Sequence, residues 1–117
     1  MAATAPAPAA LVTGANRGIG AALLSRLDAR GPAIGTARDL PENGGAAEWL
    51  RLDASDSEDF DRLERALDGR PVGLLVCNAG IYPDKGQNLA VGYPPRMWAE
   101  TFAVNVTGVF LAVQALL

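Results

Sequence analysis

The sequence predicts an α/β fold in which a doubly wound parallel sheet is covered by helices on both faces. Short apolar runs of strand length alternate with helical repeats along the chain. A glycine-rich turn joins the first run to the first helical repeat, and residues 72–77 are continuously apolar, as parallel strands with covered faces are. This alternation is typical of right-handed β-α-β units. The length of 117 residues suits one domain.

The first three elements lie between residues 9 and 37. Residues 9–13 form a short apolar run that ends at Gly14, which predicts a buried strand leading into a tight turn. Apolar residues then recur at intervals of four, at Ile19, Leu23 and Leu27. This spacing predicts a helix, which the Gly-Pro pair at 31–32 ends. Residues 33–37 predict the second strand.

The middle of the chain predicts a loop, a strand and a helix. Residues 39–47 contain a proline and two adjacent glycines, so we expect a loop with at most a turn or two of helix. Residues 49–52 predict the third strand. Ser55 and Glu58 have the spacing of a capping box, which predicts that the second helix begins there. The apolar face of this helix comprises Phe60, Leu63 and Leu67.

The last elements are a strand at residues 72–77, a loop and a helix that begins at Arg96. We predict that Cys77 is a buried residue of the strand. Apolar residues of the helix step by fours and threes, at Trp98, Phe102, Val106, Val109, Val113 and Leu116. The pattern is still apolar at Leu117, without a capping glycine. We therefore expect a chain that is incomplete at its C-terminus, with an uncovered apolar sheet edge at 72–76.

Composition and charge exclude several classes of function. Ten Lys and Arg residues stand against thirteen Asp and Glu residues, a net charge of -3, so we expect no nucleic-acid partner. One cysteine and no histidine exclude an internal disulfide, a zinc site and Ser-His-Asp or Cys-His catalysis within this chain. We therefore expect no metal site.

The N-terminus and the hydropathy predict a cytoplasmic protein. Residues 1–8 are rich in Ala and Pro and lack the basic start of a secretory signal, so we expect a flexible lead-in before a domain at residues 9–117. No uninterrupted apolar run approaches the roughly 18 residues that a membrane helix needs. We therefore expect no membrane partner.

The strongest functional signal is the glycine-rich turn Thr-Gly-Ala-Asn-Arg-Gly-Ile-Gly at residues 13–20. A strand that turns sharply into a helix presents free N–H groups and the positive end of the helix dipole, which together bind a pyrophosphate. Gly14 would permit the turn, Gly18 would let phosphates approach the backbone, and Gly20 would let the helix pack closely. The predicted cofactor-binding residues here are Thr13, Gly14, Asn16, Arg17, Gly18, Ile19 and Gly20. The alternative is a glycine-rich turn that binds no ligand.

Three motifs, in order along the chain, resemble those of the short-chain dehydrogenase/reductase family. They are the Thr-Gly-x-x-x-Gly-x-Gly turn, Asn78-Ala79-Gly80 at the end of the fourth strand and Asn105-Val106-Thr107-Gly108 in the last helix. The resemblance extends from about Ala9 to the last residue. Residues 13–20 and 36–39 are similar to the carbonyl-reductase-like and C-factor-like branches. The resemblance implies a Rossmann fold, of which this chain would supply the first four strands.

The resemblance also implies roles for single residues. Asp53 would hydrogen-bond the adenine amino group, or alternatively supply charge at the N-terminus of the next helix. Asn78 would tie neighbouring strands together, while Ala79 and Gly80 would let the cofactor ribose approach. Asn105 would hold a water in a proton relay, and the alternative is an amide that satisfies backbone groups in a kinked helix.

The end of the second strand determines the expected cofactor, because an acid there favours NAD and an arginine accommodates the 2′-phosphate of NADP. Arg38 follows that strand and Arg17 lies in the glycine turn, so the two could clamp the 2′-phosphate. We therefore expect NADP(H) to be preferred over NAD(H), although Asp39 is adjacent to Arg38. The alternative is that both arginines are solvated surface charges.

In the family, a tyrosine donates the proton while a hydride passes from the nicotinamide, and a lysine four residues later assists it. This chain lacks that pair, because Lys85 has Ile81 four residues before it and neither Tyr82 nor Tyr93 has a lysine four residues after it. The resemblance therefore implies the cofactor-binding half of an NADP(H)-dependent oxidoreductase. It would act on a small-molecule carbonyl or alcohol and form a homo-oligomer through the last helix. The alternative is a non-catalytic dinucleotide-binding or interaction module.

Overall fold

A computed structural model describes residues 7–83, 86, 88, 90, 92 and 94–116. Four parallel strands form one sheet in the order β3-β2-β1-β4. The strands are β1 (Ala9–Val12), β2 (Ala33–Ala37), β3 (Glu48–Arg51) and β4 (Val72–Val76). The helices are α1 (Gly18–Asp28), α2 (Ser57–Leu67), α3 (Pro95–Phe102), the π-helical stretch η1 (Ala103–Thr107) and α4 (Gly108–Leu116). The predicted α/β class and parallel sheet are confirmed.

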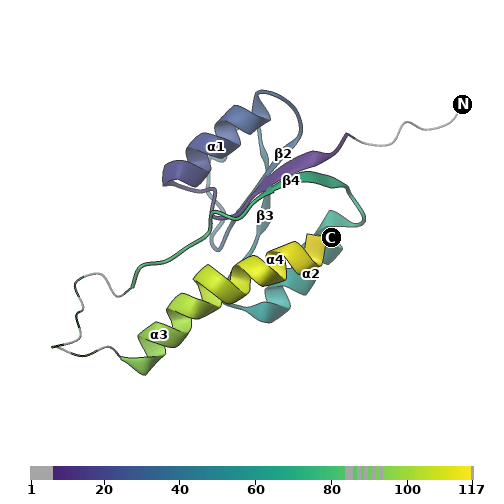
Figure 1. The fold of residues 1–117 in the computed structure, drawn as a ribbon. Helices are drawn as coiled ribbons and strands as arrows, with labels where there is room; N and C mark the ends of the chain where they lie inside the picture. Colours follow the sequence, from purple (N-terminus) through teal and green to yellow (C-terminus); the bar gives the residue numbers. More distant parts are fainter. Residues whose placement is uncertain are drawn as a thin grey trace, which may run out of the picture.

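Helices cover the two faces of the sheet (Figure 1). One face packs against α1, around the buried side chains of Val12 and Leu24. The other face packs against α2 and α4, where Leu11 and Ile34 of the sheet meet the helices. The helical side chains in this second cluster are Phe60, Leu63, Leu67 and Ala112. The sheet is therefore wound on both sides, with the larger apolar cluster beneath α2 and α4.

The predicted apolar stripe of α1 is confirmed at Leu27, which packs against the buried cluster of this face, but it is one position out of place earlier in the helix. Gly20 and Leu24 are the buried residues of this helix, whereas Ile19 is 74% exposed. The reason is the close approach at Gly20, where a side chain would overlap the carbonyl oxygen of Gly14 and the amide nitrogen of Asn78. The glycine faces inward because only it fits there, and Ile19 is turned outward.

The connection between β2 and β3 is a loop without a helix, within the range predicted for residues 39–47. The indole of Trp49 packs under this loop and donates a hydrogen bond from Nε1 to the carbonyl oxygen of Gly44 (2.8 Å). Its ring also lies against Gly35, where an added Cβ would be 2.9 Å from Cζ3 of Trp49. The connection from β2 to β3 contains no helix. Trp49 therefore covers part of this face of the sheet instead.

The start of α2 differs from the predicted capping box. Asp56 is the N-cap, and its Oδ1 accepts a hydrogen bond from the Glu58 N–H (3.0 Å). Ser55 does not cap the helix, because its hydroxyl donates to Asp53 (2.6 Å). The predicted apolar face is confirmed, since Phe60, Leu63 and Leu67 are all buried.

The predicted apolar stripe of the last helix is wrong for most of its residues, although Leu116 packs against the core and Val109 is half-buried. Its buried residues are Val104, Gly108 and Ala112. Gly108 permits a close approach, since a Cβ there would lie 3.0 Å from the carbonyl oxygen of Ala54. Small residues therefore make the closest approach to the rest of the fold, and several large ones point outward. The exposed side chains are Trp98, Phe102, Val106, Phe110 and Val113.

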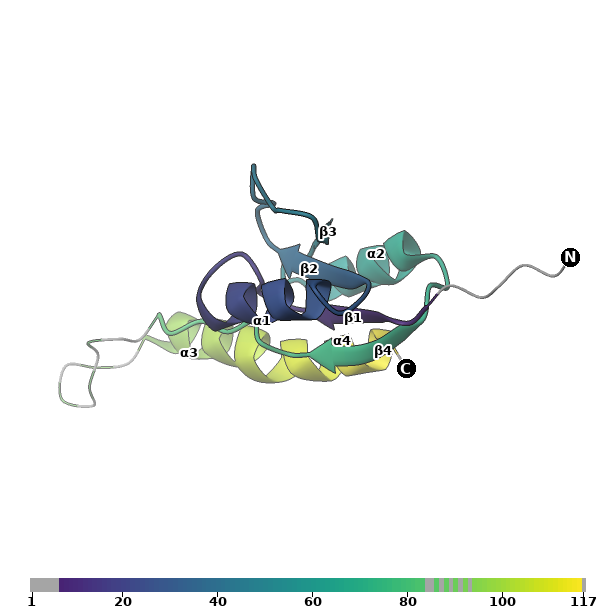
Figure 2. The same ribbon diagram turned by 90° about the horizontal axis from the view of Figure 1, so that it is seen from above.

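The segments α3, η1 and α4 run on as one long helical rod (Figure 2). This rod, Pro95–Leu116, has a mean hydropathy of 1.4 over its most apolar window, of which 17% is buried. By length and composition it could cross a membrane, a test that core helices of soluble proteins also pass. The absence of a long uninterrupted apolar run in the sequence did not indicate such a helix, because polar residues such as Asn105 and Thr107 interrupt the run.

Within the described residues, β4 is an edge strand of the sheet, as the predicted strand count implied. Leu74 is 48% exposed. The prediction that Cys77 is a buried strand residue is wrong, because the strand ends at Val76 and Cys77 is exposed. The partner strand β1 ends at Val12, opposite Val76, so no ladder continues to Cys77. Partial desolvation still raises the pKa of its thiol.

Candidate functional site

The carboxyl ends of the strands open onto a groove of about 500 Å³. Ligand pockets of proteins have volumes of about 300–1,000 Å³. The predicted site residues that line the groove are Gly14, Asn16, Arg17, Gly18, Ile19, Arg38, Asp53, Asn78, Ala79 and Gly80. Three other predicted residues, Thr13, Gly20 and Asn105, are not among the lining residues. Most of the predicted residues therefore meet in one place, where open parallel sheets bind ligands.

The three glycines of the turn differ in their surroundings. Gly14 has a φ of 63°, and an added Cβ would lie 2.8 Å from Cα of Ala79. Gly18 has a φ of 58° and nothing within 4 Å of an added Cβ, so its side toward the groove is open. Arg17 is the N-cap of α1 and makes no side-chain capping bond. The first N–H groups of α1 therefore lack a side-chain cap beside an open glycine, as a bound phosphate requires.

Thr13 and Asn78 join the glycine turn to the residues that follow β4. The hydroxyl oxygen of Thr13 accepts hydrogen bonds from the N–H groups of Asn78 and Ala79, both at 3.0 Å. The Asn78 side chain donates from Nδ2 to the carbonyl oxygen of Gly14 (3.0 Å). Thr13 is buried. It therefore acts beneath the groove, as a connection between the ends of neighbouring strands.

Positive charge gathers at the end of β2. The Arg38 side chain is 72% exposed, and its Nε lies 3.7 Å from Oδ2 of Asp39. Its carbonyl oxygen accepts a hydrogen bond from Nε of Arg51 (3.1 Å). Arg17 and Arg38 line the same groove, so both predicted arginines are available to an anion there. Because the ion pair with Asp39 is exposed, it contributes little, and the Arg38 guanidinium can pair with another anion instead.

A buried hydroxyl in the same wall has no hydrogen-bond partner among the residues that the structure describes. Thr36 is 1% exposed, lines the groove, and its Oγ1 makes no hydrogen bond. Buried hydroxyl groups are rarely left without a partner. The orphaned hydroxyl, the open glycine and the exposed arginines together fit a phosphate-bearing, polar ligand such as a dinucleotide.

Asp53 lies at the turn between β3 and α2 and lines the groove. Its Oδ1 accepts hydrogen bonds from the N–H (3.0 Å) and hydroxyl (2.6 Å) of Ser55. These bonds lower the pKa of Asp53, which is therefore ionised at neutral pH. The alternative interpretation, charge at the helix N-terminus, describes Asp56 better, because Asp56 is the residue that caps α2.

Asn105 lies in η1, and both ends of its amide bond to one residue of the loop after β4. Its Oδ1 accepts from the Ile81 N–H (2.8 Å), and its Nδ2 donates to the Ile81 carbonyl oxygen (2.9 Å). The helix widens to a π-helical stretch here, but the amide bonds to a distant loop and not to the backbone of its own helix, as the alternative had it. Lys85 and Tyr93 lie outside the described residues, and Tyr82 is 68% exposed.

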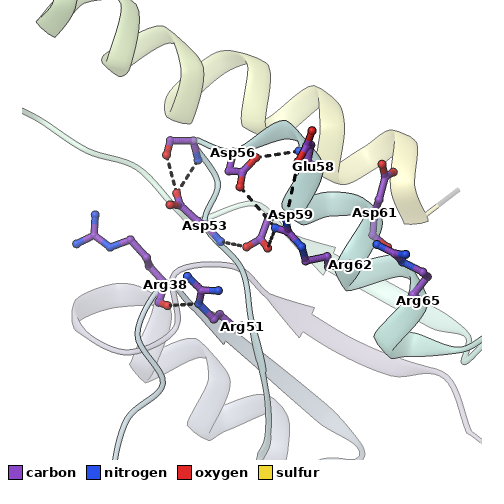
Figure 3. Close-up of polar contacts among 10 residues, drawn as sticks. Arg38, Arg51, Asp53, Asp56, Glu58, Asp59, Asp61, Arg62 and Arg65 are labelled. Atoms are coloured by element: carbon purple, nitrogen blue, oxygen red, sulfur yellow. Dashed lines mark hydrogen bonds and ion pairs between the residues drawn. The ribbon is translucent and has the colours of Figure 1, made fainter.

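Sequence reasoning missed one buried acid beside the groove. Asp59 is 3% exposed, and its Oδ2 accepts a hydrogen bond from the Asp53 N–H (2.6 Å) (Figure 3). A signal existed, because Asp59 is four residues before the core residue Leu63 and so lies on the inward face of α2. Within the described part of the chain, no group of three or more His, Cys, Asp or Glu residues is arranged to hold a metal ion.

Comparisons with known proteins agree with this arrangement. A sequence model of the short chain dehydrogenase family matches residues 8–117. The 3-oxoacyl-(acyl-carrier-protein) reductase MabA of Mycobacterium tuberculosis is 35% identical over 113 residues, which cover 89% of this chain and 42% of MabA. The chain spans about half the length of the curated relatives it matches.

Two solved structures are similar in both fold and sequence. A metagenomic short-chain oxidoreductase in complex with NADP has a TM-score of 0.80 and 30% identity, over 92% of this chain and 54% of that one. The 3-ketoacyl-(acyl-carrier-protein) reductase of Brucella melitensis, complexed with NADH, has a TM-score of 0.78 and 31% identity, over 96% and 50%. The similar proteins thus bind either of the two nicotinamide dinucleotides.

Proposed function

The chain belongs to the short-chain dehydrogenase family, and we propose that it forms the NADP(H)-binding part of an oxidoreductase that acts on a small-molecule carbonyl or alcohol. The observation that carries the proposal is the groove, which brings an open glycine turn, two arginines and an ionised aspartate together. Relatives named 3-oxoacyl-(acyl-carrier-protein) reductases support a carbonyl substrate.

Each part of the groove suits one part of a dinucleotide. The uncapped N–H groups of α1 beside Gly18 would bind the pyrophosphate. The carboxylate of Asp53 would accept the adenine amino group. Arg38, with Arg17 across the turn, would bind the 2′-phosphate, for which a guanidinium is well suited. This expected contact with the 2′-phosphate supports a preference for NADP(H). The similar structures favour neither cofactor, because they include one NADP complex and one NADH complex.

The nicotinamide, when bound, would supply or accept the hydride. This chain's residues would hold the cofactor and shape the floor beneath it. Asn78 and Ala79 are fixed by Thr13, and Asn105 holds the loop at Ile81 in place. Asn105 would also hold a water molecule in a proton relay. The 117 residues contain no Tyr-x-x-x-Lys spacing, so the proposal assigns them no proton donor.

A second candidate is a dinucleotide-binding module without catalysis. For either candidate, we propose a cytoplasmic location and self-association through the exposed face of the α3–α4 rod. The face includes Trp98 and Phe102, whose rings stack at 5.1 Å between centroids. Turnover of an aldehyde or ketone with NADPH would separate the oxidoreductase from the module.

Calorimetric titration of the chain with NADPH and with NADH tests the cofactor proposal. We expect both to bind, NADPH more tightly. A folded chain that binds neither dinucleotide would overturn the proposed function, and tighter binding of NADH would overturn only the preference.

A further inference from the structure

We propose that Asp59 is a positioning residue for adenine recognition: its buried carboxylate fixes the backbone at Asp53, so that the Asp53 carboxylate faces the groove. The inference rests on the proposed dinucleotide binding. It assigns a role to a residue that lies outside every motif of the sequence.

The carboxylate of Asp59 connects a helix to a turn (Figure 3). Its Oδ2 accepts the N–H of Asp53 at 2.6 Å, and its Oδ1 accepts Nη1 of Arg62 at 2.8 Å. The side chain is 4% exposed, whereas that of Arg62 is 52% exposed. The two oxygens therefore have separate partners, and the arginine lies on the solvent side of the buried acid.

This contact is not an ordinary helix cap. Asp56 already caps α2 through the Glu58 N–H, and Oδ2 of Asp59 bonds outside its own helix, to the Asp53 N–H. An ionised carboxylate is costly to bury unless it is paired and hydrogen-bonded. Burial alone would raise the pKa of Asp59, but the Asp53 N–H and the Arg62 guanidinium outweigh it and lower that pKa. The charged form is therefore the one that holds Asp53.

The backbone that Asp59 holds is the wall of the groove. Leu52, Asp53, Ala54 and Ser55 all line it. Both hydrogen bonds from Ser55 reach Oδ1 of Asp53. Within the described part of the chain, Oδ2 of Asp53 is thus left to a donor in the groove. An exocyclic amino group is such a donor, and its recognition depends on where the backbone at Asp53 directs the carboxylate.

The test compares NADPH with its hypoxanthine analogue, which lacks the adenine amino group. Binding of both is measured by calorimetry for the unchanged chain and for Asp59→Asn, Asp59→Ala and Asp53→Ala. The matched control is Asp61→Asn, which removes the same charge from an exposed position of the same helix. A general loss of stability would weaken both cofactors equally, so the ratio of the two affinities isolates positioning.

We expect the unchanged chain and Asp61→Asn to prefer NADPH by about tenfold, the size of one hydrogen bond to a charged group. Asp59→Ala and Asp53→Ala should lose most of this preference. Hydrogen exchange at the Asp53 amide should quicken in Asp59→Asn, which covers the case in which Asp59→Ala does not fold. An unchanged affinity ratio in a folded Asp59 variant, or an unchanged exchange rate, would overturn the inference. Equal affinities of the unchanged chain for NADPH and its hypoxanthine analogue would overturn only this inference. If neither cofactor bound, the proposed function would be overturned as well.

Discussion

Asn105 and Ile81 are joined by a reciprocal pair of hydrogen bonds across 24 positions of the chain. One amide side chain therefore satisfies both the donor and the acceptor of a single peptide position in the loop after β4. The same side chain approaches Gly80, where an added Cβ would lie 3.3 Å from Oδ1 of Asn105. The loop that borders the groove is thus held against the π-helical stretch η1.

Replacing Asn105 with alanine should release this loop. Two partly exposed hydrogen bonds are lost, so we expect the free energy of unfolding to fall by about 1–2 kcal/mol. Urea denaturation measures the change, and hydrogen exchange at the Ile81 amide should quicken. The exposed Gln114 on α4 offers a control, since Gln114→Ala should alter neither. An Ile81 amide that stays equally protected in Asn105→Ala would contradict the assignment.

Replacing Arg38 with alanine should remove much of the preference for NADPH. A guanidinium contact with a phosphate is charge-assisted, so we expect the affinity for NADPH to fall about tenfold while that for NADH barely changes. Because Arg38 is exposed, the difference should shrink at high salt. Arg26→Ala on the exposed side of α1 is the control. Equal losses for both cofactors would show that Arg38 does not contact the 2′-phosphate.

Gly20 and Gly31 form a matched pair for a test of packing. A Cβ at Gly20 would overlap the carbonyl oxygen of Gly14 and the side chain of Asn78, whereas one at Gly31 would meet nothing within 4 Å. We expect Gly20→Ala to lower the free energy of unfolding by about 1–3 kcal/mol, and Gly31→Ala to change it by less than about 0.5 kcal/mol. Thermal unfolding compares the two, and equal melting temperatures would refute the close approach.

Stability should fall in acid partly through Asp59. The pKa of its carboxyl lies below the ordinary value of 3.8 in the folded chain, so the folded state binds this proton less readily than the unfolded state. Its contribution is therefore complete above the unfolded pKa and is lost as the pH falls through the folded pKa. Urea denaturation between about pH 5 and about pH 2 should show a shallower acid slope for Asp59→Asn than for Asp61→Asn. Identical acid slopes for the two variants would contradict this contribution of Asp59 to stability.

Strand positions and the contents of the groove could be predicted from sequence, because they depend on local signals. Residues 33–37 are the whole of β2, since a run of small apolar residues between a Gly-Pro pair and Arg38 has few alternatives. The glycine turn gave the place of the groove for a similar reason: a turn of that spacing between strand and helix specifies its own geometry.

The faces of two helices could be predicted only in part, because apolar periodicity does not say which of two stripes is packed. In α1, the exclusion of any side chain at Gly20 decides the rotation. In the last helix, Gly108 and Ala112 allow close packing and leave Trp98 and Phe102 outside. The role of Asp59 was likewise hidden, since it depends on a bond to the backbone of Asp53 that no spacing records.

The bonds of Thr13 and Asn78 have a consequence for the energetics of ligand capture. They connect the glycine turn to the residues after β4 through bonds within the chain itself. Two walls of the groove are thus preorganised, and little conformational entropy remains to be lost there when a dinucleotide arrives. The contacts that a ligand makes with one wall therefore contribute nearly in full to its affinity. Because the two walls are joined by hydrogen bonds, a substitution that shifts one wall should also shift the other.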